Sequence, residues 1–101
     1  KHMNEIYEYL KKKKISLSVA IYPHPGQLIH DNKDSKQVKI WKNFCKNKCK
    51  YFINYFPDFF DELKINNSKK IIKKYYIKND IHFNFKGNKK IFDKLKELNF
   101  Q

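Results

Sequence analysis

The sequence contains no arginine. All 23 of its basic residues are lysine and only 10 residues are acidic, which gives a formal net charge of +13 over 101 residues. Arginine supplies the bidentate hydrogen bonds that recognise phosphate and guanine, so its absence argues against a specific nucleic-acid partner. Lys, Asn, Ile, Phe and Tyr dominate together, as an AT-rich coding sequence would produce. We therefore attribute the basicity to composition, with a functional basic surface as the alternative.

Cysteine, proline and glycine are also scarce, with two, three and two residues. Cys45 and Cys49 are four positions apart and would share a face of a helix. There they would bind a metal ion together, form a disulfide, or remain free thiols. No histidine stands nearby at the spacing of a zinc site, so we interpret both as buried small hydrophobic residues and expect no metal. Long apolar runs are missing too, since none reaches the length of a membrane span.

Two stretches predict parallel β-strands. Apolar and small residues alternate over Ile15–Tyr22, which predicts a strand buried on both faces, as in a parallel α/β sheet. Pro23–Gly26 ends this strand and predicts a loop to about Asp34, followed by a helix capped at Ser35. The aromatic run Tyr51–Phe56 predicts the second strand, and a strand-helix-strand unit of this length implies parallel pairing.

Helical spacing predicts further helices on both sides of these strands. One ends in the lysine run before the first strand, and another begins at Pro57 and reaches Leu63, where Phe59 and Phe60 pack against the sheet or line an acyl pocket. A short helical or irregular stretch follows Asn66-Asn67-Ser68, in which Ser68 is a cap. The last helix begins at Asn84 and carries its apolar face on Ile91, Phe92, Leu95 and Leu98.

The most informative stretch lies just before that last helix. Asp80 stands two residues before His82, and a carboxylate at this spacing can accept a hydrogen bond from one ring nitrogen. That bond fixes the tautomer and leaves the other nitrogen free to take a proton from a nucleophile. Asn84 fits an N-cap, and Gly87 would let another backbone approach closely. The alternative is structural: Asp80 caps the turn and His82 packs beside neighbouring phenylalanines.

The pattern Asp-x-His-x-Asn-x-x-Gly at residues 80–87, followed by an amphipathic helix, resembles the last conserved block of the SGNH (GDSL-type) hydrolases. These are esterases, lipases and related carbohydrate O-acyltransferases. Val19–Pro25 is similar to the late strand and loop of their fold. Many members have Asp-x-x-His, and the shorter spacing here is similar to an Asp-x-His-Trp-Asn variant of a carbohydrate-acetylating branch, with Phe83 in place of Trp.

The resemblance implies a flavodoxin-like three-layer α/β/α fold, of which residues 1–101 would be the C-terminal part of one domain. It implies ester hydrolysis or acyl transfer through a serine nucleophile on an ester or an acylated carbohydrate, without a cofactor. His82 would act as general base and then acid, and Asp80 would orient it. His24, beyond the end of a strand, and Asn84 are the substrate-binding candidates.

None of the serines stands in a strand-to-helix elbow with glycine neighbours, so none is assigned as the nucleophile; they are Ser16, Ser18, Ser35 and Ser68. The nucleophile block and the oxyanion block of the resembled family are expected upstream of Lys1, and we expect the 101 residues alone to be inactive. Two strands are too few for this fold. We therefore expect the missing N-terminal half as a partner, or self-association through an exposed sheet edge.

Two other interpretations remain open at this point. In the first, the chain is a lysine-rich, aromatic nucleic-acid-binding module, in which Tyr51, Phe52, Tyr55 and Phe56 stack on bases. In the second, it is a non-catalytic α/β fragment. The aromatic residues are clustered as a strand and do not form an alternating exposed platform, which counts against the nucleic-acid module.

Overall fold

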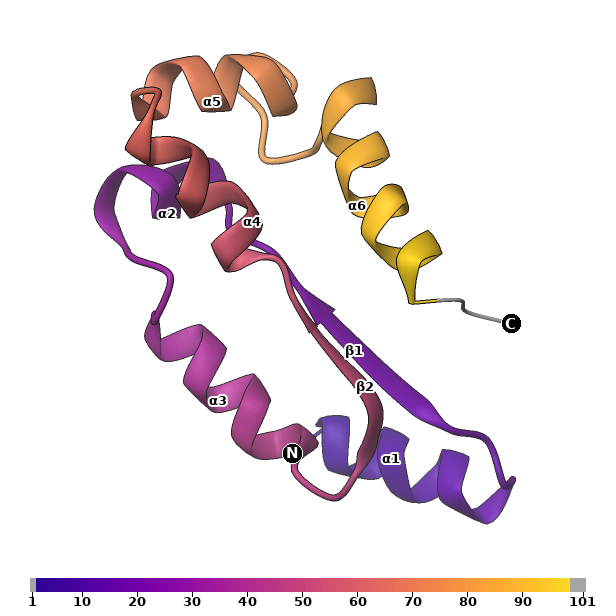
Figure 1. Cartoon of the computed structure of the whole chain (residues 1–101). Coiled ribbons are helices and arrows are strands. Elements are labelled where there is room, and N and C mark those ends of the chain that lie inside the picture. The colour runs from indigo at the N-terminus through magenta and orange to yellow at the C-terminus, as the bar shows by residue number, and fades with distance from the viewer. Residues whose placement is uncertain (1, 99–101) are drawn as a thin grey trace.

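Two parallel strands run through the middle of an α/β structure whose other elements are helices (Figure 1). The computed structural model describes residues 2–98 of the chain. In chain order the elements are α1 (His2–Lys12), β1 (Leu17–Ile21), α2 (Pro25–His30), α3 (Lys36–Cys45), β2 (Cys49–Asn54), α4 (Phe56–Phe60), the 3-10 helix η1 (Asp61–Lys64), α5 (Ser68–Tyr75) and α6 (Phe85–Glu97). None of the helices in this part of the chain is long and apolar enough to cross a membrane.

The sheet confirms the predicted strand-helix-strand unit. β1 and β2 pair in parallel, in a register that runs from Ser18 opposite Tyr51 to Ile21 opposite Asn54. α3 connects the strands and packs against both of them. The strands are shifted from their predicted limits, because β1 is shorter than residues 15–22 and β2 begins at Cys49 and ends before Tyr55.

The prediction that β1 is buried on both faces is wrong. Ile21 is buried, but Ala20 is exposed and the remaining residues of the strand are half-buried. The physical reason is the small size of the sheet: within residues 2–98 it has two strands, so the outer edge of β1 pairs with no third strand. Such an edge leaves backbone hydrogen-bonding groups unpaired.

The loop predicted after Pro23 contains a short helix instead. Pro25 opens α2, where its fixed φ and missing N–H suit the first helical turn. The backbone N–H of His24 donates to Oε1 of Gln27 at 2.9 Å, which ties the start of the helix to its first turn. The proline cluster was therefore a helix start as well as a strand end. Leu28 is the buried residue of this helix and packs in the core.

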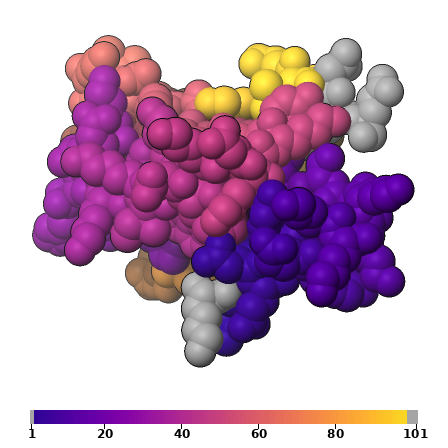
Figure 2. Space-filling model, turned by 90° about the horizontal axis from the view of Figure 1, so that it is seen from below, coloured from indigo at the N-terminus to yellow at the C-terminus, as the bar shows by residue number. Residues whose placement is uncertain are grey.

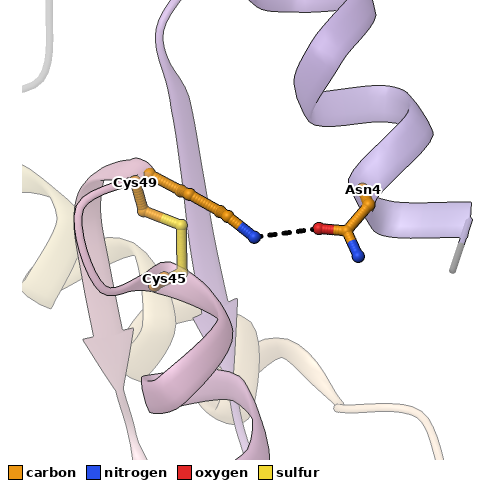
Figure 3. The surroundings of a disulfide bond; sticks show 4 residues. Asn4, Cys45 and Cys49 are labelled. Atoms are coloured by element: carbon orange, nitrogen blue, oxygen red, sulfur yellow. Dashed lines mark hydrogen bonds between the residues drawn. A yellow bond between two sulfur atoms is a disulfide. The ribbon is translucent and has the colours of Figure 1, made fainter.

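Cys45 and Cys49 form a disulfide, which corrects the expectation of two free buried thiols (Figure 3). α3 ends at Cys45, and Asn47 then takes a left-handed φ of 63°, a conformation that asparagine tolerates better than most residues. The resulting turn brings the two Cα atoms to 4.8 Å. In the same turn, Nζ of Lys48 donates to Oδ1 of Asn4 at 2.9 Å and so connects the disulfide turn with α1.

The core lies at the carboxyl ends of the strands. Tyr55, Phe56 and Phe59 are completely buried there, together with residues of α2 and α5. Phe59 and Phe60 belong to this core, so of the two alternatives considered for them the packing one is confirmed. The aromatic sequence after β2 therefore forms the centre of the molecule instead of its surface.

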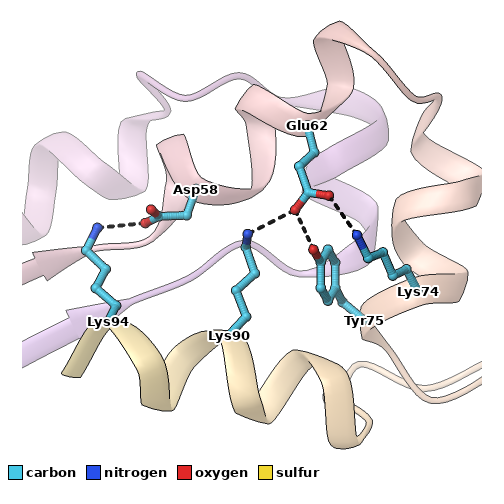
Figure 4. Close-up of polar contacts among 6 residues, drawn as sticks. All are labelled: Asp58, Glu62, Lys74, Tyr75, Lys90 and Lys94. Carbon is cyan, nitrogen blue, oxygen red and sulfur yellow. Dashed lines mark hydrogen bonds and ion pairs between the residues drawn. The ribbon is translucent and has the colours of Figure 1, made fainter. Parts of the chain in front are cut away.

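Two charged side chains of the α4–η1 segment hold α6 in place (Figure 4). Glu62 accepts hydrogen bonds from the Tyr75 hydroxyl at 2.6 Å, from Lys90 at 2.9 Å and from Lys74 at 3.3 Å. Burial of the Glu62 carboxyl raises its pKa, but the hydrogen bonds from Tyr75 and Lys90 and the Lys90 charge outweigh burial, so the pKa is lowered overall. Asp58 forms a second contact with α6, an ion pair with Lys94 at 2.7 Å, which Figure 4 shows beside the Glu62 contacts.

The packed face of α6 was predicted with one error. Ile91, Leu95 and Leu98 pack against the core as expected, but Phe92 is 59% exposed. The cap of α5 was also misplaced, since Oδ1 of Asn67 accepts from the backbone of α5 and Ser68 is the first helical residue.

α1 is the least integrated helix. None of its residues is buried. In the space-filling view from below, its indigo atoms stand beside the body of the molecule (Figure 2). It lies near the amino ends of the strands, away from the core.

Candidate functional site

The loop that carries Asp80 and His82 is closed on itself. Tyr76 and Phe83 form an antiparallel bridge at its base. Inside the bridge, the backbone N–H of Ile77 donates to the carbonyl of His82 at 2.9 Å, and the N–H of Asp80 donates to the carbonyl of Ile77 at 3.0 Å. Asn79 adopts a left-handed φ of 60° at the tip. These contacts reverse the chain within a few residues.

Within this loop, the structure brings Asp80 and His82 together. Nδ1 of His82 lies 2.7 Å from Oδ1 of Asp80. The same oxygen accepts the backbone N–H of Ile81 at 2.6 Å and that of His82 at 3.2 Å. Asp80 therefore caps the turn and contacts the imidazole with the same oxygen atom. The predicted Asp80–His82 contact and the turn cap of the structural alternative are both present.

The hydrogen bonds of this pair favour an ionised Asp80 and one tautomer of His82. The bond from the His82 side chain, followed by that from its backbone N–H, lowers the pKa of Asp80, which favours the carboxylate form. A carboxylate at Nδ1 selects the tautomer with its proton on Nδ1, and Nε2 then carries the lone pair. The His82 side chain is 74% exposed and that of Asp80 is 43% exposed, so the imidazole is not packed beneath the last helix.

An aromatic cluster positions the loop. Phe83 stacks on Phe59 with ring centroids 5.5 Å apart, and it also contacts Tyr76 and Tyr22, each at 4.8 Å. The buried hydroxyl of Tyr76 donates to the carbonyl of Pro23, two residues beyond the end of β1, and burial raises the pKa of this tyrosine. The loop therefore lies at the carboxyl end of β1, where open α/β sheets bind their ligands.

His24 lies at the same end of the sheet. Its ring stacks on Tyr22 at 6.5 Å, and Tyr22 in turn contacts Phe83. His24 is exposed, and aromatic rings connect it with the loop that carries His82. Its assignment to substrate binding stays a prediction. Tyr22 and Tyr76 were not singled out from the sequence, although a tyrosine at the last predicted strand position is a signal for such a contact.

Asn84 is the N-cap of α6, as predicted. Its Oδ1 accepts from the backbone N–H of Gly87 at 2.9 Å, while its Nδ2 donates to the carbonyls of Lys74 at 3.0 Å and of Tyr76 at 3.4 Å. Both polar atoms of the side chain are thus used to join α5 with α6. Asn84 positions the loop, and its additional role in substrate binding stays a prediction.

The close backbone approach expected at Gly87 is present. A Cβ atom at this position would lie 2.2 Å from the carbonyl oxygen of Tyr75 and 2.7 Å from a ring carbon of Phe83. Only glycine therefore allows the first turn of α6 to lie against the end of α5. Because Asn84 and Gly87 act at the same junction, the sequence pattern after His82 has a structural explanation.

The serines occupy structural positions. Oγ of Ser35 is buried and accepts from the backbone N–H of Val38 at 3.3 Å, as expected of a helix cap. Ser18 lies in β1 and Ser68 begins α5, while Ser16 precedes β1. Among residues 2–98, no three His, Cys, Asp or Glu side chains are grouped so that they could hold a metal ion.

The aromatic residues proposed for base stacking are not all accessible. Tyr55 and Phe56 are completely buried, so this version of the nucleic-acid-binding interpretation is wrong for them. The Tyr55 hydroxyl donates to the carbonyl of Ile91 at 2.8 Å, and burial together with the charge of Asp58 raises its pKa to about 12. The physical reason is the core itself, which is built from these rings.

Comparison with known proteins adds no family to this geometry. The chain matches no family model, no curated protein and no solved structure.

Proposed function

We propose that this chain supplies the Asp–His pair of a serine ester hydrolase or O-acyltransferase, within a flavodoxin-like three-layer domain of the SGNH type. The observation that carries the proposal is the 2.7 Å contact between Asp80 and Nδ1 of an exposed His82. The position of their loop beyond the carboxyl end of β1 supports it, because that is where the fold would collect the other reacting groups.

In the proposed reaction, Nε2 of His82 takes the proton of a serine hydroxyl while the serine oxygen attacks the acyl carbon of the ester. The imidazolium then gives this proton to the leaving alcohol as its bond to the acyl carbon breaks. Asp80 remains ionised and stabilises the imidazolium. Water completes hydrolysis, and a sugar hydroxyl completes transfer. We propose that the nucleophile and the oxyanion donors belong to residues upstream of Lys1.

The unpaired edge of β1 supports the proposal that further strands of the sheet come from the remainder of the domain. A strand from the remainder of the domain would satisfy the backbone groups of this edge and cover the exposed side of Ala20. Without it, we expect the 101-residue chain to associate through the same edge. A sharp calorimetric transition of a species that light scattering shows to be monomeric would contradict this expectation.

The test of catalysis uses a fluorophosphonate probe on the complete product of the reading frame that encodes this chain. We expect labelling of one serine, with His82→Ala lowering both labelling and ester turnover by about two to four orders of magnitude. His30→Ala is the matched control, because His30 lies at the end of α2 and is exposed. Absence of labelling, or equal loss in both variants, would refute the proposal.

The 101-residue chain provides a second measurement. We expect no burst of nitrophenol from nitrophenyl acetate, because the largest electrostatic contribution to such catalysis comes from oxyanion donors that we assign elsewhere. A burst that disappears in His82→Ala would show that a nucleophile is already present in these residues.

A further inference from the structure

Lysines lie along α5, in the chain that leaves this helix and at the start of α6. We call this surface the α5 basic face and define it by six residues: Lys69, Lys70, Lys73, Lys78, Phe85 and Lys86. Two hollows meet at Lys73. One lies between α5 and the start of α6 and includes Lys70 and Phe85, and the other lies beside the chain that leaves α5 and includes Lys69 and Lys78.

No acidic side chain of residues 2–98 is paired with the lysines of this face. No Asp or Glu side chain lines either hollow. Its five lysines form no ion pair within residues 2–98, whereas the neighbouring Lys74 is paired with Glu62 at 3.3 Å. All five are exposed. The face therefore offers uncompensated positive charge around a concave surface, which attracts polyanions.

An accessible aromatic ring distinguishes this face from two other lysine-lined hollows. The hollow at the end of α3 contains Lys39, Lys42 and Lys46, but its ring, that of Phe52, is half-buried and packs against the core. Phe85 is 82% exposed, and no other ring or ammonium group within residues 2–98 lies against it. The hollow beside α1 also has lysines and a ring, but Nζ of Lys11 and of Lys48 lie 5.9 and 5.8 Å from the Tyr7 centroid. The ring of Tyr7 is thus occupied by the protein's own cations, and that of Phe85 is open.

An extended single strand of nucleic acid fits this combination. Lysines at positions 69 and 73 are one helical turn apart, about 6 Å along the axis, so that successive phosphates of one strand can reach successive lysines. An unpaired base can stack on Phe85, which a base inside a duplex cannot do. Lysine binds phosphate as a point charge and does not read base edges bidentately, so the absence of arginine is compatible with binding that ignores sequence.

We propose that the α5 basic face, with Phe85 as a stacking platform, binds single-stranded nucleic acid without sequence preference. This goes beyond the proposed ester chemistry and does not depend on it, because the lysines and the ring are complete within the 101 residues. It also replaces Tyr55 and Phe56, which the core buries, with a different set of residues.

The experiment measures fluorescence anisotropy of a labelled twelve-nucleotide oligothymidylate with the 101-residue chain over a range of salt concentrations. The charge variant is the triple substitution K69Q, K70Q and K73Q. We expect at least tenfold weaker binding, and a slope of log K against log salt that is smaller by about 2, as three phosphate contacts to a single strand predict. The matched control is K11Q, K12Q and K13Q, which removes the same net charge near α1 and should change affinity much less.

The ring is tested separately by Phe85→Ala, with Phe92→Ala as its control because Phe92 is the other highly exposed phenylalanine of α6. Loss of one stacked base should weaken binding about 5- to 100-fold for Phe85→Ala. Phe92→Ala should bind like the unmodified chain. Circular dichroism of each variant establishes that the fold is retained, which is expected because every substituted side chain is exposed or part of a surface helix.

Three results would overturn the inference. Equal losses in the two lysine variants would show that net charge alone attracts the oligonucleotide. Unchanged binding by Phe85→Ala would exclude stacking. Competition by polygalacturonate that matches competition by unlabelled oligothymidylate would instead assign the face to acidic carbohydrate. Labelling by the fluorophosphonate probe is independent of all three results, so the two proposals fail separately.

Discussion

The two ends of the sheet differ in how completely they are packed. At the carboxyl ends of the strands, α4, α5 and α6 enclose Tyr55, Phe56 and Phe59 completely. At the amino ends, α1 has no buried residue, and Tyr9 remains 62% exposed. The candidate catalytic pair lies at the packed end and is held there by Phe83. The difference shows that a two-stranded sheet is sufficient to hold this loop in place within residues 2–98.

The largest expected effect comes from removing the centre of the packed end. Phe59→Ala should destabilise the chain by about 3–5 kcal/mol, because it deletes a fully buried ring that contacts Tyr75 and Phe83. Urea denaturation followed by circular dichroism measures the loss. Tyr9→Ala on α1 is the control and should change stability by less than about 0.5 kcal/mol. Similar losses in both variants would mean that the two ends are equally important for folding.

A smaller but sharper effect is expected at the junction of α5 and α6. Gly87→Ala should cost about 1–3 kcal/mol, because the new Cβ meets a backbone carbonyl that cannot move without separating the helices. The same substitution at Gly26, where a Cβ meets nothing within 4 Å, should be neutral or slightly stabilising. Equal midpoints of urea denaturation for the two variants would contradict the close approach.

The acid stability of the packed end should depend on Glu62. Its pKa is lower in the folded chain than in the unfolded one, so its stabilisation is complete above the unfolded value of about 4.3 and is lost as the pH falls through the folded value. At pH 7, Glu62→Gln should cost about 1–2 kcal/mol, and this difference should shrink in acid. Asp61→Asn is the control, since its ion pair with Lys64 is exposed. A gap between Glu62→Gln and the unmodified chain that stays constant from pH 7 to pH 3 would be evidence against the carboxylate network.

The smallest effect concerns the attachment of α1. Lys48→Ala removes the hydrogen bond to Asn4 and the ammonium group near Tyr7 and Phe44. Because these contacts are exposed or half-buried, global stability should fall by no more than about 0.5–1 kcal/mol. Hydrogen exchange should nevertheless become faster in α1 while that of α5 stays unchanged. Faster exchange in both helices would mean that α1 is part of the same cooperative unit, and Lys46→Ala provides the reference.

Local patterns were sufficient for some features and not for others. The parallel strand-helix-strand unit and the cap at Asn84 follow from short-range signals. So does the contact of Asp80 with His82, since the two residues are only two positions apart. The exposure of Phe92 and the disulfide could not be derived in this way. Helical spacing gives a stripe of apolar residues but not its width, and the left-handed turn at Asn47 decides whether two thiols meet.

The burial of the aromatic residues after β2 depended on long-range packing. Tyr55 and Phe56 continue an apparent strand in the sequence, but the chain leaves the sheet at Asn54 and turns into α4. The side chain of Asn54 accepts the backbone N–H of Phe56 at 3.0 Å and so marks this turn. Which rings end in the interior is decided by α5 and α6, which lie later in the sequence.

The bridge between Tyr76 and Phe83 closes the loop that carries Asp80 and His82. Inside the bridge, the hydrogen bonds of the loop join residues no more than five positions apart, between Ile77 and His82. Under the proposed function, two separately expressed polypeptides would therefore form the catalytic centre after they associate. This chain would present the base already in position, and the other would deliver the nucleophilic alcohol and the oxyanion donors.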